Sequence, residues 1–402
     1  MKWVVRDVVT HGAFPFWNPY FSAGQPLAAN PAYQVFYPLH WLILLPSFHF
    51  GFQLHIVVHF VIAALGMYLP LRGLGASPIA STFGAAVFVL SGPYLSVATK
   101  LPMLFALSWM PLALGCARRA IDRPSGRRFA IAALILSLQL IIAEPMIVAQ
   151  TWMFIAGYAI WRWNWRKDLL TIGGLALAAL LVAAVQLIPA IDFARDSVRS
   201  NAFTYEDVAD WSMPGSRLVE LGLPSVFRPD AIKTMYRGRT EAFVMEMYIG
   251  VFALLLAIAG ILTGIRGARI VVIAMTVATL LAMGEHTPLL KLLYATHVIR
   301  SIRYPEKWIV GGAFVLIVWA ALLFDLLLER DRRLMRTMLT VSVIWLAVVL
   351  IAFLSASHHY FGEQLIRAIA VVGFVLLLRS GRPALGVAII AAAIVDGWVA
   401  TR

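Results

Sequence analysis

Long apolar runs separated by short polar connections make up most of this 402-residue chain. A helix that crosses the hydrocarbon core of a bilayer needs roughly 20 apolar residues, and many of the runs approach this length. The shorter runs on either side of Glu144-Pro145 indicate a re-entrant or broken element. In all, we predict twelve membrane-spanning helices, at about residues 52–71, 78–96, 101–117, 129–143, 146–161, 169–188, 244–263, 270–284, 306–328, 337–355, 365–379 and 383–400.

The stretch from residue 14 to residue 46, before the first apolar run, has a different pattern, with six prolines distributed among aromatic residues. Each proline removes a backbone donor and biases the preceding residue toward extended geometry, so the stretch cannot be one regular helix. Trp and Tyr side chains are typical of the headgroup level of a membrane. The pattern predicts a kinked cap at the membrane surface.

Four parts follow from this pattern along the chain. Residues 1–50 are the predicted cap, and residues 51–189 the first set of membrane helices. Residues 190–243 form a long loop that contains acidic and basic residues in nearly equal numbers, and residues 244–402 form the second helix set. We expect the loop to be folded, with most of its charges in contact with solvent.

Composition supports the same class. Hydrophobic residues make up 61% of the chain and charged residues 13%, and the mean hydropathy is +0.84, which excludes a soluble globular protein. The predicted fold class is therefore an all-α polytopic membrane protein embedded in a lipid bilayer. The single cysteine, Cys116, excludes an internal disulfide, and it belongs to no CxxC motif. We expect neither a metal nor an organic cofactor.

The formal charge of +13 does not indicate a nucleic-acid partner once the basic residues are assigned to loops. By the positive-inside rule, loops rich in Lys and Arg face the cytoplasm, so the cap, the 190–243 loop and both termini face the other side. The first twelve residues contain no apolar core of signal-peptide length, and we therefore expect a further span upstream of Met1. The basic residues lie in alternate connections, around residues 72, 118–128, 162–167, 266–269, 330–336 and 379–382.

Several separated motifs carry a family resemblance. They are WNPYFSAGQPLAANPAYQVFYPLHWLILLP at 17–46, SWMPLALG at 108–115, IPAIDFARDSVRS at 188–200, WSMPGSRLVELGLPSVF at 211–227, YIGVFALLLA at 248–257 and MGEHTPLLKLLYATHVIRSIRYPEKW at 283–308. In these motifs and in their order, over almost the whole chain, the sequence resembles the YfhO-like bacterial membrane proteins.

The resemblance implies a bundle of the GT-C glycosyltransferase type in the bacterial cell membrane. It also implies an enzyme that moves a sugar from a polyprenyl-phosphate donor to a cell-envelope glycan or lipid acceptor on the extracytoplasmic face. Relative to the family pattern, this chain lacks a first span with an Asp-bearing loop before Gly12 and a C-terminal extracytoplasmic domain.

Glycosyl transfer from a lipid phosphate requires cations that stabilise the leaving phosphate. Arg303 and Lys307, at the start of a predicted span, are candidates, because an arginine fork and a lysine point charge both bind phosphate. Their alternative role is anchoring at the membrane interface. Arg199 is a third candidate, and its alternative is a solvated loop position.

The reaction also requires a carboxylate that accepts the proton of the acceptor hydroxyl. Glu144 lies between two apolar runs beside a proline, so it either lines a cavity or occupies a turn at the surface. Asp7 is the second candidate for catalysis. Asp192 and Asp196 are more simply explained by pairing with Arg195 or with Arg199.

Three further residues complete the predicted binding site. His59 lies four residues after His55 on one helix face, a spacing that suits two metal ligands, but a hydrogen bond beneath the cap is the preferred interpretation. Trp17 either stacks on a sugar or prenyl chain or belongs to an interfacial belt. Asn18 shapes the pocket rather than performing chemistry. A non-catalytic membrane protein, either a lipid-linked sugar transporter or an assembly partner, is the alternative function.

Overall fold

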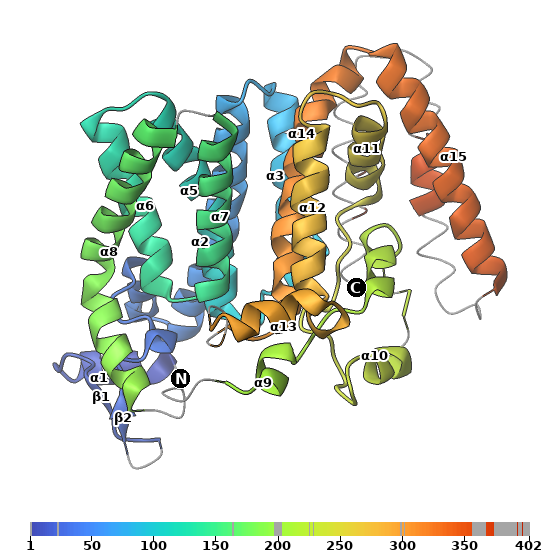
Figure 1. Ribbon diagram of the computed structural model, residues 1–402. Helices are drawn as coiled ribbons and strands as arrows, with labels where there is room; N and C mark the ends of the chain where they lie inside the picture. The colour runs from blue at the N-terminus through green and yellow to red at the C-terminus, as the bar shows by residue number, and fades with distance from the viewer. Residues whose placement is uncertain are drawn as a thin grey trace. The chain divides into compact units, whose positions relative to one another are not determined.

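The structure is a computed structural model, and it describes residues 2–21, 24–162, 165–196, 203–224, 226–227, 229–297, 300, 302–355, 367–373, 392 and 396. Helices dominate it (Figure 1), and the two strands among these residues are two residues long each. The all-α class is therefore confirmed.

Six helices in the described ranges are long and apolar enough to cross a membrane, and each overlaps a predicted span. Two shorter apolar helices, Val251–Leu262 and Ala268–Ala282, overlap two more. The predicted spans at 365–379 and 383–400 lie mostly outside the described residues. A multi-pass membrane protein is supported, and the number of twelve spans stays a prediction. The six helices are Phe48–Gly73, Pro78–Ser96, Leu101–Asp122, Lys167–Arg195, Pro305–Leu328 and Arg332–Ile351.

The chain divides into two compact units. Unit 1 contains residues 1–66 and 99–203, and unit 2 contains residues 67–98 and 204–402. The segment 67–98, which hydropathy assigns to the first helix set, thus packs within the second unit. Helix α2 (Phe48–Gly73) supplies residues to both.

Unit 1 is built on α5 (Leu101–Asp122), α6 (Gly126–Ile142), α7 (Pro145–Arg162) and α8 (Trp165–Arg195), and α5 packs against the other three (Figure 1). Small residues allow the helices to approach closely, as is usual for membrane helices. Their core includes the fully buried Ala113, Ala117, Ala132, Leu136 and Ala179.

An ion-pair network joins the ends of these helices that carry the basic connections. Asp122 accepts hydrogen bonds from Arg118, at 3.2 Å, and from Arg162. The Arg162 Nε also donates to Asp168 at 3.1 Å. The connections of unit 1 that were predicted to be cytoplasmic therefore lie at one end of the unit.

The predicted cap lies in unit 1 and is not a regular helix, as expected. It consists of α1 (Lys2–Thr10), β1 (Trp17–Asn18) paired antiparallel with β2 (Gln25–Pro26), and the 3-10 helices η1 (Pro31–Tyr33) and η2 (Pro38–Leu44). The Arg6 guanidinium donates hydrogen bonds to three backbone carbonyls, those of Ile43, Leu45 and Pro46, at 2.8–3.1 Å. These bonds satisfy the irregular backbone that leads into α2.

The predicted break beside Pro145 is confirmed. Helix α6 ends at Ile142, Ala143 adopts the left-handed conformation with φ 55°, and α7 begins at Pro145. Proline is tolerated at the first position of a helix, because the backbone N–H that it lacks would have no partner within the helix there. The break therefore separates two helices within unit 1.

Unit 2 is organised around α14 (Trp308–Leu328), which packs against α3 (Pro78–Leu90), α11 (Val251–Leu262) and α12 (Ala268–Ala282) (Figure 1). Gly260 on α11 allows close approach, because a Cβ there would lie 2.1 Å from Leu323 Cδ1 of α14. Helix α4 (Gly92–Ser96) follows α3, and α15 (Arg332–Ser355) packs on α11.

The two ends of unit 2 have different characters. At one end Asp325, near the end of α14, accepts from the Ser77 N–H at 2.7 Å, which joins the connections before α3 and after α14. At the other end, η6 (Pro305–Lys307) contacts the start of α14, and the segments near it contain further short helices. They are α9 (Tyr205–Ala209), η4 (Gly215–Leu221), α10 (Pro229–Met235), η5 (Gly284–His286) and α13 (Pro288–Ala295).

The described residues of the 190–243 loop are folded, as predicted. Helix α9 begins with a capping box in which Thr204 and Asp207 satisfy each other's backbone N–H groups. Helix α8 extends to Arg195, so Asp192 and Arg195 form an exposed ion pair at 3.3 Å on its last turn. The simpler explanation of Asp192 is confirmed.

Candidate functional site

Two of the predicted substrate-binding residues meet in one cluster at the start of α14. Its centre is three aromatic rings, Trp211, Phe243 and Tyr304, and its margin is three cations, Arg239, Arg303 and Lys307. We refer to these six residues as the cation–aromatic cluster. All belong to unit 2.

The three rings contact one another in the arrangements that aromatic pairs prefer. Trp211 meets Tyr304 edge-on, with centroids 4.8 Å apart, and Phe243 stacks on Tyr304 at 5.3 Å. The Trp211 indole N–H donates to the Glu241 carbonyl at 3.1 Å. The rings thus form one fixed platform.

Each cation lies over the face of a ring, where the ring quadrupole attracts positive charge. The Arg239 guanidinium is 4.3 Å from the Trp211 centroid, and the Arg303 guanidinium is 4.8 Å from that of Tyr304. Lys307 Nζ is 5.0 Å from the Phe243 centroid and 5.5 Å from that of Tyr304. Arg239 also pairs with Asp210 at 2.7 Å. The arrangement concentrates positive charge on an aromatic surface.

Two of the platform residues have strained backbones. Trp211 has φ 54° and Tyr304 has φ 69°, in the left-handed region that bulky residues rarely adopt. Each costs about 1–2 kcal/mol relative to an ordinary conformation. Such strain persists where surrounding contacts over-determine it, and it is concentrated at functional sites.

A buried polar network lies beneath the platform. It consists of Arg217 and Glu220 on η4, Tyr236 just after α10, and Glu306 on η6. Arg217 donates to both carboxylates, to the Tyr236 hydroxyl at 2.9 Å and to the Val244 carbonyl at 3.0 Å. Arg217 and Glu306 are both 0% exposed. We refer to these four residues as the Arg217 network.

The electrostatics of this network follow from burial. Two carboxylates share one guanidinium away from water, where an unpaired charge is strongly unfavourable. Burial raises the pKa of the Glu220 carboxyl, and the hydrogen bond from Arg217 opposes that shift. Burial also raises the pKa of the Tyr236 phenol, as does the nearby Glu306 carboxylate. Tyr236 is therefore a neutral donor to Glu306.

The predicted residues of the cap lie in unit 1. The Asp7 side chain is 18% exposed, and it accepts a hydrogen bond from the Tyr20 hydroxyl at 3.2 Å and lies 3.6 Å from His11 Nδ1. The bond to Asp7 raises the pKa of Tyr20. Trp17 is 53% exposed, and Asn18 is buried with its amide donating to the Tyr33 hydroxyl at 3.2 Å. This hydrogen bond holds Asn18 within the cap, and its part in shaping a binding pocket stays a prediction.

His59 is packed beneath the cap, as preferred from the sequence. Its Nε2 lies 2.7 Å from the Tyr37 hydroxyl of the cap, and that hydroxyl also accepts from the Trp109 indole N–H at 2.7 Å. Its Nδ1 lies 2.6 Å from the His55 carbonyl. Both ring nitrogens are thereby occupied. No group of three or more His, Cys, Asp or Glu side chains is arranged for a metal within the part of the chain that the structure describes.

The two remaining predicted residues are placed differently. Glu144 is half-buried in the turn between α6 and α7, which agrees with the turn interpretation. Arg199 lies outside the described residues. Unit 1 thus holds Asp7, Trp17, Asn18, His59 and Glu144, and unit 2 holds Arg303 and Lys307.

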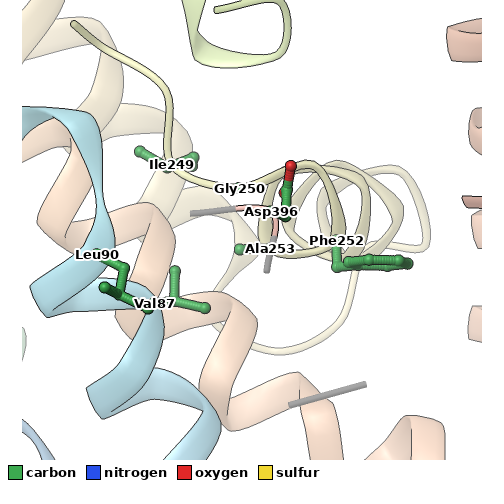
Figure 2. A pocket seen from close by; sticks show the side chains of 7 residues that line it. All are labelled: Val87, Leu90, Ile249, Gly250, Phe252, Ala253 and Asp396. Atoms are coloured by element: carbon green, nitrogen blue, oxygen red, sulfur yellow. The ribbon is translucent and has the colours of Figure 1, made fainter. Parts of the chain in front are cut away.

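A small pocket in unit 2 contains a single carboxylate among apolar side chains (Figure 2). Asp396 accepts from the Tyr248 hydroxyl at 2.6 Å and from the Val251 N–H at 3.0 Å, at the start of α11. It also pairs with Arg367 at 3.3 Å. Its carboxylate therefore caps a helix and balances an arginine, which is a structural role. The other lining residues are Val87, Leu90, Ile249, Gly250, Phe252 and Ala253.

No family model, no curated protein and no solved structure matches the chain. The resemblance to the YfhO-like proteins stays a prediction.

The sequence interpretation did not identify the Arg217 network. Arg217 and Glu220 lie in a loop whose charges were expected to be solvated, and the structure buries both. The available signal was their position in the WSMPGSRLVELGLPSVF motif, and that of Glu306 in RYPEKW. Trp211 and Glu306 also join those two motifs, because the Glu306 N–H donates to the Trp211 carbonyl at 3.1 Å.

Proposed function

We propose that the protein is a membrane glycosyltransferase of the GT-C type. It transfers a sugar from a polyprenyl-phosphate donor to a cell-envelope glycan or lipid acceptor, on the extracytoplasmic face of the bacterial cell membrane. The observation that carries the proposal is the cation–aromatic cluster, in which Arg303 and Lys307 lie on one aromatic platform at the start of an apolar helix of spanning length.

The cluster has the chemistry that a lipid phosphate requires. A guanidinium and an ammonium together hold a phosphate and stabilise the negative charge that develops on it as the sugar leaves. Aromatic faces bind the apolar face of a sugar or the first isoprene units of the lipid. An interfacial end of a membrane helix is the depth at which a lipid phosphate lies.

Asp7 is the proposed base that accepts the proton of the acceptor hydroxyl. Its carboxylate is partly accessible, accepts a hydrogen bond from the Tyr20 hydroxyl and lies 3.6 Å from His11 Nδ1. Glu144 is the other candidate from the sequence, and it is half-buried in the turn between α6 and α7. In either case the carboxylate acts as a general base on the hydroxyl that attacks the sugar.

The test is transfer of radiolabelled glucose from polyprenyl-phosphate glucose to an envelope fraction by the full chain in vesicles. We expect Arg303→Ala and Lys307→Ala to lower transfer at least tenfold, and Asp7→Asn to abolish transfer without weakening donor binding. Lys291→Ala, which removes an exposed lysine on α13, is the matched control. Unchanged transfer by Arg303→Ala would remove this cluster from the site.

The same experiment distinguishes the enzyme from the alternative, a non-catalytic membrane protein. A lipid-linked sugar transporter or assembly partner would bind the donor through Arg303 and Lys307 and release no labelled product. Binding without transfer, for each sugar tested, would therefore favour the non-catalytic protein.

A further inference from the structure

We propose that Glu306 is a positioning residue for phosphate binding: its buried carboxylate holds the aromatic platform on which Lys307 and Arg303 lie. This inference rests on the proposed function, since it concerns the same lipid-phosphate site. Glu306 is fully buried, so it acts through its neighbours and does not touch the ligand.

Glu306 joins the separate segments that supply the platform. Its carboxylate accepts from the Phe243 N–H at 2.9 Å, from the Tyr236 hydroxyl at 2.8 Å and from Arg217. Its own N–H donates to the Trp211 carbonyl at 3.1 Å. One residue thus fixes two of the three rings through their main chain, and the third ring, Tyr304, is two positions before it.

The strained conformations give these bonds a purpose. Trp211 and Tyr304 both have positive φ, and the main-chain bond from the Glu306 N–H to the Trp211 carbonyl joins the two segments that carry them. The Glu306 carboxylate holds its segment in place through Arg217, Tyr236 and the Phe243 N–H, and without these bonds the strained residues would relax and the edge-on contact of the two rings would be lost. Lys307 and Arg303 would then lose the ring faces that orient them.

The chemistry of the network requires a carboxylate at this position. Glu306 receives a charged donor, a hydroxyl and a backbone N–H, and an ionised carboxylate accepts all of them. Glutamine has the same shape but supplies one acceptor oxygen, and its NH₂ group would face one of the three donors. Glu306→Gln therefore breaks the positioning with little change in volume.

The experiment measures the affinity of the full chain in nanodiscs for farnesyl phosphate, with farnesol as the probe that lacks the phosphate. We expect Glu306→Gln to weaken farnesyl phosphate binding at least tenfold and to leave farnesol binding within twofold. Tyr236→Phe removes one of the donors to the Glu306 carboxylate, and we expect it to weaken farnesyl phosphate binding about threefold. Glu285→Gln, which breaks an exposed ion pair with Arg237, is the matched control and should have no effect.

A double-mutant cycle separates positioning from general damage. In a Lys307→Ala background, Glu306→Gln should weaken binding less than threefold, because one of the two cations that it positions is absent. Equal losses in both backgrounds would overturn the proposal and leave Glu306 as a structural residue. If Glu306→Gln does not fold, unchanged phosphate affinity in Tyr236→Phe overturns it instead.

Failure of this inference differs from failure of the proposed function. If Lys307→Ala and Arg303→Ala weaken farnesyl phosphate binding but Glu306→Gln does not, the site stands and the positioning role falls. If neither cation variant changes the affinity, the phosphate site itself is wrong.

Discussion

Replacing Arg217 with methionine should lower the free energy of unfolding of unit 2 by more than any surface substitution in the same loop. Methionine has a comparable length and no charge, so the change removes the donors and keeps most of the volume. It leaves the Glu220 and Glu306 carboxylates buried without their shared cation, and it removes the donor to the Val244 carbonyl.

The size of the effect follows from burial. Arg217 and Glu306 are both 0% exposed, and breaking a buried ion pair from one side costs about 3–5 kcal/mol. Arg237 provides the comparison, because its side chain is 68% exposed and pairs with Glu285 on the surface. An exposed pair contributes about 0–1 kcal/mol, so Arg237→Met should change stability by less than 1 kcal/mol.

The assay is the free energy of unfolding of the purified chain in detergent micelles, followed by near-ultraviolet circular dichroism during denaturant titration. Double variants with Glu306→Gln test the reasoning further, since removing one carboxylate should recover part of the loss caused by Arg217→Met. A loss of less than 1 kcal/mol for Arg217→Met, equal to that of Arg237→Met, would refute the conclusion that this network stabilises unit 2.

Two other predictions concern unit 1. Gly51→Ala should lower the stability of unit 1 by about 1–3 kcal/mol, because a Cβ at residue 51 would lie 2.2 Å from the Leu42 carbonyl oxygen. Gly157→Ala is the control, because a Cβ there meets nothing within 4 Å, and it should be neutral or stabilising. Thermal unfolding measures both variants. Burial lowers the pKa of Lys2 to about 7 from 10.5, so between these values the unfolded chain binds more protons and the cap should become more stable as pH rises. The slope should approach about 1.4 kcal/mol per pH unit, measured by hydrogen exchange of the cap after correction for intrinsic rates, and Lys2→Met should abolish it.

The hydropathy pattern was sufficient to locate the long apolar helices that the structure describes. A membrane helix satisfies its own backbone hydrogen bonds, so a local run of apolar residues is enough to predict its position in the sequence. The same holds for the cap and for the break at Pro145, because proline acts on its own backbone and on the residue before it. These elements were predicted correctly because their causes are local.

The candidate site was only partly predictable. Arg303 and Lys307 were identified by their place at the start of a span, and His59 by its place beneath the cap. The cluster members Trp211, Arg239 and Phe243 lie at least 60 residues before them in the chain, and no local pattern joins such segments. The grouping of residues 67–98 with unit 2 was likewise invisible, because it depends on which helices pack together.

Two arginines of one loop show which properties the sequence determines and which depend on the tertiary structure. Sequence alone determined that this is a multi-span helical membrane protein with a folded polar loop that contains both Arg217 and Arg237. Only the tertiary structure decided that Arg217 is buried between two carboxylates while Arg237 lies on the surface. The reason is that burial of a charge depends on partners brought from elsewhere in the chain, here Tyr236 and Glu306.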